Sequence, residues 1–156
     1  MKSKSKKMIC TTISSLALAT IYLAWLEWRP VLIIANHQYR SYSDILVMNM
    51  PLTDSAKIKW WQKHKLELKR LYNIPQPEPD GWYAINFWLF HDGYKEDDGY
   101  DRLCFDDMKS KAHCIDKDRV FSVQWSQNQG TELTVHDGYY LYDKTGHLRK
   151  FKFDPL

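Results

Sequence analysis

The sequence predicts an α+β protein: a single N-terminal transmembrane helix followed by one small domain, in which one amphipathic helix packs on an antiparallel β-sheet. Three observations predict this arrangement. The nineteen residues from Met8 to Leu26 carry no charge, residues 54–72 repeat apolar side chains at the helical period, and short strand-like runs separated by glycines fill the rest. The chain has 156 residues, enough for one domain, and its 15% aromatic content favours an ordered core.

The uncharged N-terminal stretch has the length of a membrane anchor. A helix of nineteen residues extends about 29 Å, close to the thickness of a bilayer's hydrocarbon core. Trp25 and Trp28 fall where an interfacial aromatic belt would lie, and Arg29 follows them. Four lysines precede the stretch: Lys2, Lys4, Lys6 and Lys7. This excess of positive charge predicts a cytoplasmic N-terminus.

Domain boundaries follow from this anchor. We expect a cytoplasmic basic tail over residues 1–7, a transmembrane anchor over residues 8–28 and an α+β domain outside the cytoplasm over residues 29–156. The predicted protein crosses the membrane in a single pass, with the lipid bilayer contacting the segment from Met8 to Leu26. The alternative is a cleaved signal peptide with Ala17-Leu18-Ala19 as its small-x-small site. That cut would leave the densest apolar run, residues 21–26, on a secreted protein that has no use for it.

Charge and motif content exclude several classes of function. Residues 29–156 hold 18 basic and 18 acidic side chains, so the folded part is neutral. A general nucleic-acid binder needs a basic surface, and we therefore expect no nucleic-acid partner. The sequence contains no nucleophile elbow, zinc-protease motif or phosphate-binding glycine loop. We expect neither enzymatic activity nor a cofactor.

The elements of the domain can be placed in order. Two strands are predicted at residues 30–37 and 44–50, and a helix follows over residues 54–72 with Thr53 or Asp54 as its N-cap. One arc of this helix is apolar, and six cations lie on the remainder. We expect these cations to form a solvated face, because amphipathic helices normally expose their charged side. Contact with lipid headgroups is the alternative, but some thirty residues separate the helix from the anchor. Prolines from residue 75 onward end the helix. Further strands are predicted at residues 82–91, 100–106, 119–126, 131–136, 139–143 and 147–154.

Two cysteines in the domain are expected to pair. Cys104 and Cys114 lie in one hairpin-like segment on the side of the membrane where disulfides persist. A redox pair usually has a tighter spacing, and a zinc site would need two more ligands where only His113 is near. The sequence therefore favours a structural disulfide.

Residues 91–107 form an acidic segment that could bind a basic partner. Its carboxylates are Asp92, Glu96, Asp97, Asp98, Asp101, Asp106 and Asp107. Calcium is an alternative ligand, although the spacing does not match an EF-hand loop. Solvated turns are the simplest interpretation, because Asp-Gly pairs are typical of tight hairpins.

The triplet Asp-Gly-Tyr occurs three times, at residues 92–94, 98–100 and 137–139, and His91 and His136 precede two of the copies. A His-Asp pair can serve acid/base catalysis, but neighbouring residues at a strand end point to opposite faces. Repeated use of the same turn chemistry is the preferred interpretation.

Several longer motifs carry a resemblance. They are DILV at residues 44–47, PLT at 51–53, KIKWW at 57–61, YNIP at 72–75 and the segment from DGYK at 92–95 to DGYDRLCFDDM at 98–108. Together they resemble the small membrane proteins of enteric bacteria known as domain of unknown function family 943. The likeness extends from residues 29–31 to about Val123 and weakens after Gly130. It implies an inner-membrane protein with a periplasmic domain, and it brings no catalytic residues.

The resulting hypothesis is a protein-binding module anchored in the inner membrane, of the kind that serves as an immunity protein against a delivered toxin. The alternative is an accessory structural subunit of an envelope complex, with the N-terminal helix providing contacts. An envelope enzyme that uses His91 or His136 is the least supported alternative.

Overall fold

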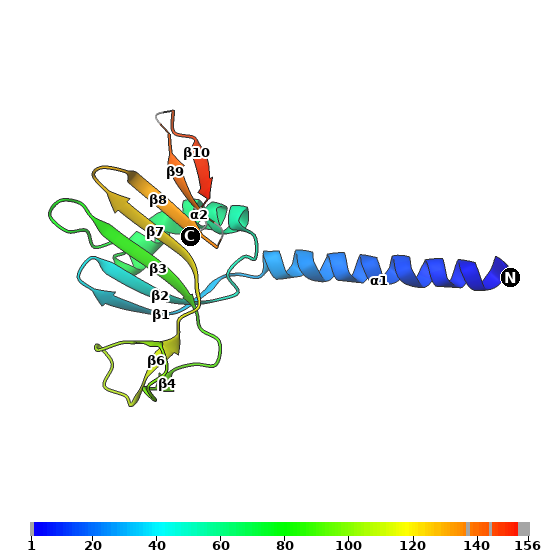
Figure 1. Ribbon diagram of the computed structural model, residues 1–156, viewed down its shortest axis with the longest axis horizontal. Helices are drawn as coiled ribbons and strands as arrows, with labels where there is room; N and C mark the ends of the chain where they lie inside the picture. The colour runs from blue at the N-terminus through cyan, green and yellow to red at the C-terminus, as the bar shows by residue number, and fades with distance from the viewer. Residues whose placement is uncertain (1, 137, 144, 153–156) are drawn as a thin grey trace.

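A computed structural model describes residues 2–136, 138–143 and 145–152 (Figure 1). The side chains of residues 2–11 and 27–28 are outside the described part, and so are those of the four N-terminal lysines and Trp28, which carried the predictions of orientation and of an aromatic belt. Asp137 of the third Asp-Gly-Tyr triplet and the end of the last predicted strand, residues 153–154, are also outside it.

The described residues form two helices and two β-sheets. The larger sheet has seven strands in the order β1-β2-β3-β7-β8-β9-β10, and the smaller has three in the order β4-β6-β5. The helices are α1 (Lys2–Trp28) and α2 (Asp54–Tyr72). The strands of the larger sheet are β1 (Leu32–Tyr39), β2 (Tyr42–Met48), β3 (Tyr83–Leu89), β7 (Arg119–Ser126), β8 (Gly130–Val135), β9 (Gly138–Tyr142) and β10 (Leu148–Lys152). Those of the smaller are β4 (Lys95–Glu96), β5 (Arg102–Cys104) and β6 (Ala112–Asp116).

The predicted antiparallel sheet is wrong in one central pairing. Strands β2 and β3 run parallel, with Ile45 opposite Phe87 and Val47 opposite Leu89, whereas the other neighbours in the larger sheet are antiparallel. The reason is that α2 carries the chain back along the sheet before β3 begins, and parallel strands require such a crossover. The architecture is mostly sheet, with the second, smaller sheet inserted between β3 and β7.

Helix α2 begins and ends where the sequence predicts. The Thr53 hydroxyl accepts a hydrogen bond from the Ala56 N–H at 3.4 Å, and Asn73 ends the helix in the left-handed conformation with φ of 54°. These are the usual roles of an N-cap threonine and a C-terminal asparagine. The capped helix covers one face of the larger sheet, where Trp61 and Leu68 are buried.

The main core lies between α2 and this face. From the sheet it takes Ile45, Val47, Ile85, Phe87, Phe121, Val123, Leu133 and Val135, and from the helix Ile58, Trp61 and Leu68. Because side chains alternate along a strand, Leu46 points to the opposite face. There it joins a second core with Phe105 and Ile115 of the inserted segment. The two cores hold α2 and the insertion on opposite faces of the sheet.

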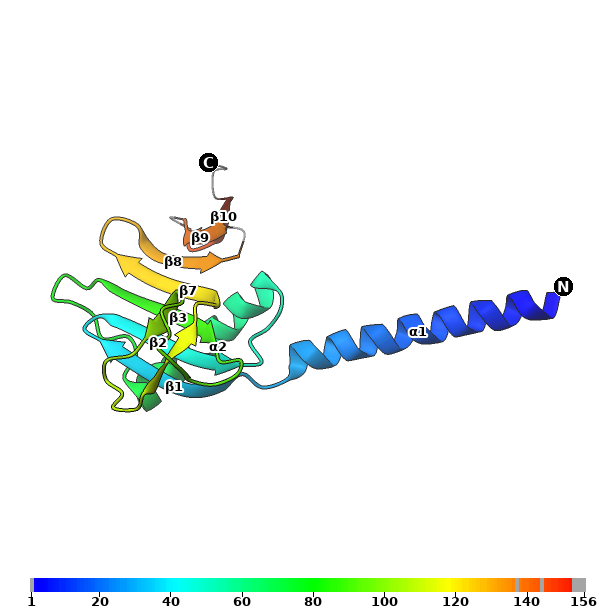
Figure 2. The same ribbon diagram turned by 60° about the horizontal axis from the view of Figure 1, so that its bottom comes forward.

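Helix α1 projects from the domain as an isolated rod with the N-terminus at its far end (Figure 2). The apolar side chains of residues 12–25 are exposed, including Leu16, Ile21 and Trp25, and Leu26 is half-buried. Within the described part of the chain, no helix is long and apolar enough to cross a membrane. The prediction of a transmembrane helix from Met8 to Leu26 is therefore wrong.

Candidate functional site

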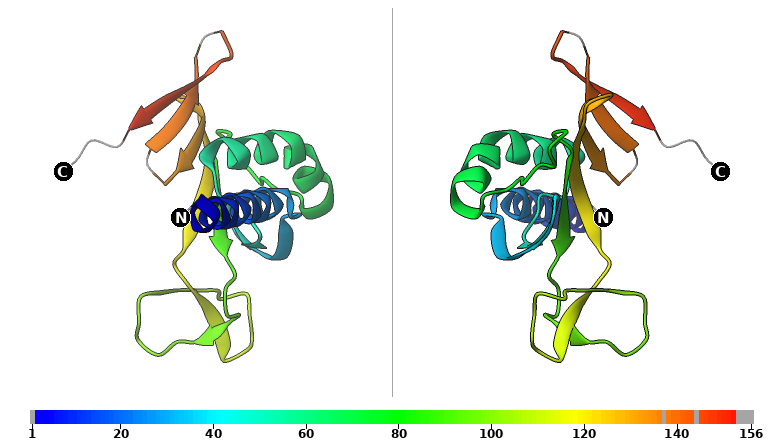
Figure 3. Two further views of the ribbon diagram at one scale, coloured as in Figure 1. Left: turned by 90° about the vertical axis from the view of Figure 1, so that its right-hand side faces the viewer. Right: turned by 90° about the vertical axis from the view of Figure 1, so that its left-hand side faces the viewer.

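The predicted acidic segment lies within a separate lobe that projects from the sheet (Figure 3). This lobe comprises residues 91–118, connects β3 to β7, and is called the acidic insert below. It contains nine acidic and five basic side chains, a net charge of −4. The insert is attached to the sheet by its apolar side, because Phe105 and Ile115 are buried against Leu46 of β2.

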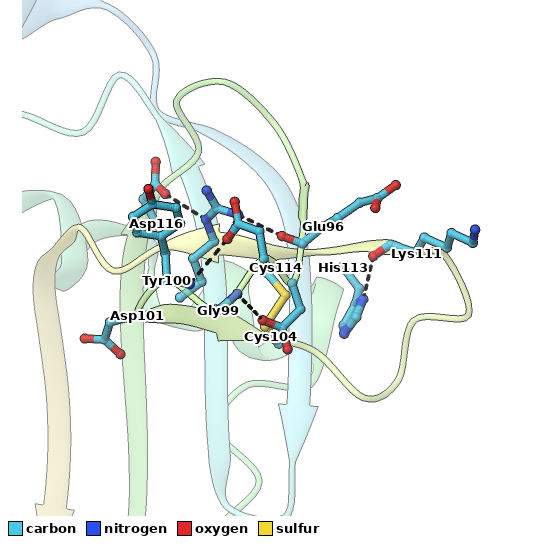
Figure 4. Close-up of a disulfide and its surroundings, with 12 residues drawn as sticks. Glu96, Gly99, Tyr100, Asp101, Cys104, Lys111, His113, Cys114 and Asp116 are labelled. Carbon is cyan, nitrogen blue, oxygen red and sulfur yellow. Dashed lines mark hydrogen bonds and ion pairs between the residues drawn. A yellow bond between two sulfur atoms is a disulfide. The ribbon is translucent and has the colours of Figure 1, made fainter.

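A disulfide crosses the small sheet of the insert. Cys104 on β5 lies directly opposite Cys114 on β6, and their sulfur atoms are at bonding distance, 2.08 Å (Figure 4). Cys114 is fully buried, next to Ile115 of the second core. The bridge therefore holds β5, which Phe105 follows directly, against β6, which carries Ile115.

The same cysteines are the strongest metal-ligand grouping in the described residues. The ligand atoms of Cys104, His113 and Cys114 lie within 4.8 Å of one another. Zinc needs thiolates and four ligands, whereas these sulfurs are bonded to each other and His113 Nδ1 lies 2.9 Å from the carbonyl oxygen of Lys111. The arrangement fits a disulfide rather than a zinc site.

The seven predicted carboxylates do not converge on one point. Most of them bind neighbouring cations or backbone groups: Asp92 with Lys95, Asp97 with the Gly99 N–H, Asp98 with Arg102, Asp101 with Lys117 and Asp107 with His37. Glu96 and Asp106 are exposed, and no partner of either carboxylate is found among the described residues. Calcium needs six to eight oxygens at one point, so the dispersed carboxylates form a charged surface instead.

A further carboxylate, which sequence reasoning did not single out, organises the insert from within. Asp116 on β6 contacts Lys95 Nζ of β4 and lies 3.4 Å from Arg102 Nε of β5. The hydrogen bond from Lys95 is the main reason that the pKa of Asp116 lies below its usual range, and the charges of Lys95 and Arg102 add to it. One carboxylate thus links all three strands of the small sheet.

A buried histidine ties the insert to the main sheet. His37 on β1 is only 8% exposed, and its ring stacks on Phe105 with 3.7 Å between the centroids. Its Nδ1 lies 2.9 Å from both carboxylate oxygens of Asp107, and its Nε2 lies 2.8 Å from the Tyr94 hydroxyl oxygen. Both ring nitrogens are therefore occupied by side chains of the insert.

This Asp–His–Tyr arrangement resembles a proton relay but fits a structural tie better. A general base needs a nitrogen within reach of a substrate proton, and His37 has neither nitrogen free. Burial, with a contribution from the Asp107 charge, raises the pKa of the Tyr94 hydroxyl and so opposes its ionisation. This tie could not be predicted from local patterns, because His37 precedes its partners by 57 and 70 residues.

His91 and His136, which the envelope-enzyme alternative would use, lie apart from this tie. His91 Nε2 lies 2.7 Å from Asp118 Oδ2, where the two ends of the insert meet. His136 is exposed in the turn between β8 and β9. The structure therefore does not assemble His91 and His136 into one site.

The family match covers this whole framework. The family described as "Enterobacterial putative membrane protein (DUF943)" matches residues 2–152. The chain belongs to this family. The resemblance seen in the sequence motifs is thereby confirmed, and the match includes α1, the sheet and the acidic insert of this DUF943 protein. No curated protein and no solved structure matches the chain.

Proposed function

We propose that this DUF943 protein is a protein-binding module of the bacterial envelope, of the immunity type, whose acidic insert captures a basic protein partner. The observation that carries the proposal is the construction of the insert. A surface of net charge −4 is held rigidly by the disulfide, by the second core around Phe105 and Ile115, and by the hydrogen bonds of His37. Preorganised surfaces lose less entropy on binding than mobile loops do.

The insert also presents an aromatic side chain among its charges. Tyr100 follows the second Asp-Gly turn and is 76% exposed, with the Arg102 guanidinium 5.7 Å from its ring centroid. Exposed tyrosines next to charged groups are frequent anchors in protein interfaces. The combination of Tyr100 with the unpaired carboxylates of Glu96 and Asp106 supports a protein partner over a metal ion.

The compartment is part of the proposal. A disulfide that braces the insert needs an oxidising environment, and in bacteria that environment is the periplasm. We place the folded domain on the periplasmic side, where a toxin delivered by a neighbouring cell would arrive. The proposal assigns no catalytic role, because binding alone neutralises such a toxin.

The binding test uses the oxidised full chain in detergent with the envelope and secreted fractions of the source bacterium. We expect retention of a basic protein at stoichiometric amounts, weakened by salt because the contact is electrostatic. The variant Glu96→Gln/Asp106→Asn should reduce retention strongly. The control Glu67→Gln/Glu132→Gln, which removes the same charge outside the insert, should retain the partner. Equal retention by both variants would refute the role of the insert.

The biological test is competition against toxin-bearing sibling cells. Deletion of the gene should make cells sensitive, and the wild-type gene should restore resistance while the Glu96→Gln/Asp106→Asn gene should not. Unchanged resistance of the deletion strain would remove the immunity function. Capture of resident membrane proteins instead of a secreted one would favour the accessory-subunit alternative.

A further inference from the structure

A groove of about 690 Å³ runs between α2 and the segment that leads into β1. Residues 29–33 form one wall, and the helix from Ala56 to Tyr72 forms the other. The groove lies on the α2 side of the sheet, opposite the acidic insert, and its volume is in the range of small-molecule sites.

The inner surface of the groove is apolar. Val31, Ile33 and Trp60 line it and pack against the main core, and Leu71 extends the surface outward as an exposed side chain. The Trp60 ring is held in place by His64, which stacks on it at 5.0 Å and whose Nδ1 lies 2.8 Å from the Trp60 carbonyl oxygen. This surface suits a hydrocarbon chain.

The rim of the groove is cationic. Lys59 and Lys63 are exposed one helical turn apart on the same face of α2, and neither forms an ion pair with a described residue. Arg29 lines the opposite wall, and its Nε is buried without a hydrogen-bond partner among the described groups. The lining residues include one acid, Glu67, against these three cations.

We propose that this groove binds an anionic phospholipid, with an acyl chain along Val31, Ile33 and Trp60 and the phosphate group at Lys59, Lys63 and Arg29. An apolar floor beside cations that form no ion pair with a described residue complements both halves of such a lipid, and basic pockets of membrane proteins bind acidic headgroups. The description of the family as "putative membrane protein" agrees with a lipid ligand. This lipid site is independent of the acidic insert.

The test measures quenching of tryptophan fluorescence by phospholipids with brominated acyl chains. The delipidated full chain in detergent micelles is titrated with brominated phosphatidylglycerol and, separately, with brominated phosphatidylcholine. We expect saturable quenching by phosphatidylglycerol and weaker quenching by phosphatidylcholine. The titrations use a Trp25→Phe/Trp28→Phe background, because the Trp25 ring lies 4.9 Å from the Arg29 guanidinium at the groove. In this background Trp60→Phe should remove the saturable component, because Trp60 lines the groove.

Charge variants on α2 provide the matched control. Lys59→Gln/Lys63→Gln should weaken phosphatidylglycerol binding about tenfold and leave the phosphatidylcholine response unchanged. Lys65→Gln/Arg70→Gln, with the same charge change on the same helix outside the groove, should have little effect. Urea unfolding of each variant verifies that it is folded.

Several results would overturn the proposal. Equal quenching by the two lipids would show that charge does not select the ligand, and equal weakening by both lysine variants would show only a general attraction to the helix. Full displacement by excess inorganic phosphate would make the groove an anion site without a role for the acyl chain. Saturable quenching that persists in Trp60→Phe would show that the lipid does not bind in the groove, and the alternative ligand of the groove would then be a protein segment.

Discussion

Removal of the disulfide should weaken the protein by an amount that follows from the loop it closes. The bond joins residues ten positions apart, which makes a closed loop of eleven residues. The chain-entropy estimate for such a loop is about 3 kcal/mol of unfolding free energy. The variant Cys104→Ala/Cys114→Ala removes the cross-link without placing a new hydroxyl at the buried position of Cys114.

The assay is urea unfolding of the full chain in a non-ionic detergent, followed by tryptophan fluorescence. With an m-value of about 2 kcal/mol/M, the midpoint of the double variant should fall by about 1.5 M relative to the oxidised wild type. Reductant should lower the wild-type midpoint similarly and leave the variant unchanged, because its remaining cysteine, Cys10, has no second thiol in the chain. A variant within about 0.5 kcal/mol of wild type, well below the loop-closure value, would refute the reasoning.

Three further perturbations test other parts of the structure. Leu46→Ala removes a fully buried side chain from the second core and should lower the free energy of urea unfolding by about 2–5 kcal/mol. Hydrogen exchange should become faster in the insert than in α2. Equal acceleration of exchange in both would contradict the presence of two separate cores. Acid should loosen the insert before the main sheet. Because the pKa of Asp116 is lowered in the folded state, its contacts with Lys95 and Arg102 stabilise the fold above about pH 4, and this stabilisation is lost as the pH falls through the lowered pKa. Hydrogen exchange in Asp116→Asn should lack part of this pH dependence. Asn73→Gly should be tolerated, because glycine readily adopts the φ of 54° found at this position, whereas Asn73→Ala should lower the free energy of unfolding by about 1 kcal/mol. Identical urea midpoints of the two variants would show that the left-handed cap contributes nothing to stability.

Local signals in the sequence predicted local structure well. Helix α2 has the predicted bounds because Thr53 supplies an N-cap and the apolar period is continuous up to Tyr72. Strand β7 coincides with its predicted range, since its β-branched and aromatic residues are typical of strands. These elements depend on neighbours a few residues away, which a single sequence displays.

Features that depend on distant contacts could not be predicted in the same way. Strands β4 and β6 were missed because Lys95–Glu96 is short and polar and the run Ala112–Asp116 has no clear alternation of apolar residues. The parallel pairing of β2 with β3 depends on how the helix crosses the sheet, and the residue composition of the strands does not indicate this. The His37 tie is equally invisible, because a histidine at the end of a strand is ordinary until its partners fold over it.

The meeting point of the two ends of the acidic insert determines what could replace the insert. Strands β3 and β7 are antiparallel neighbours with Trp88 opposite Arg119, and the Leu89 N–H donates to the Asp118 carbonyl oxygen at 2.9 Å. The 28 residues between these ends therefore leave and re-enter the sheet at nearly one place, as a hairpin loop does. Replacement of residues 92–117 by another lobe that covers Leu46 would therefore keep every strand pairing of the seven-stranded sheet.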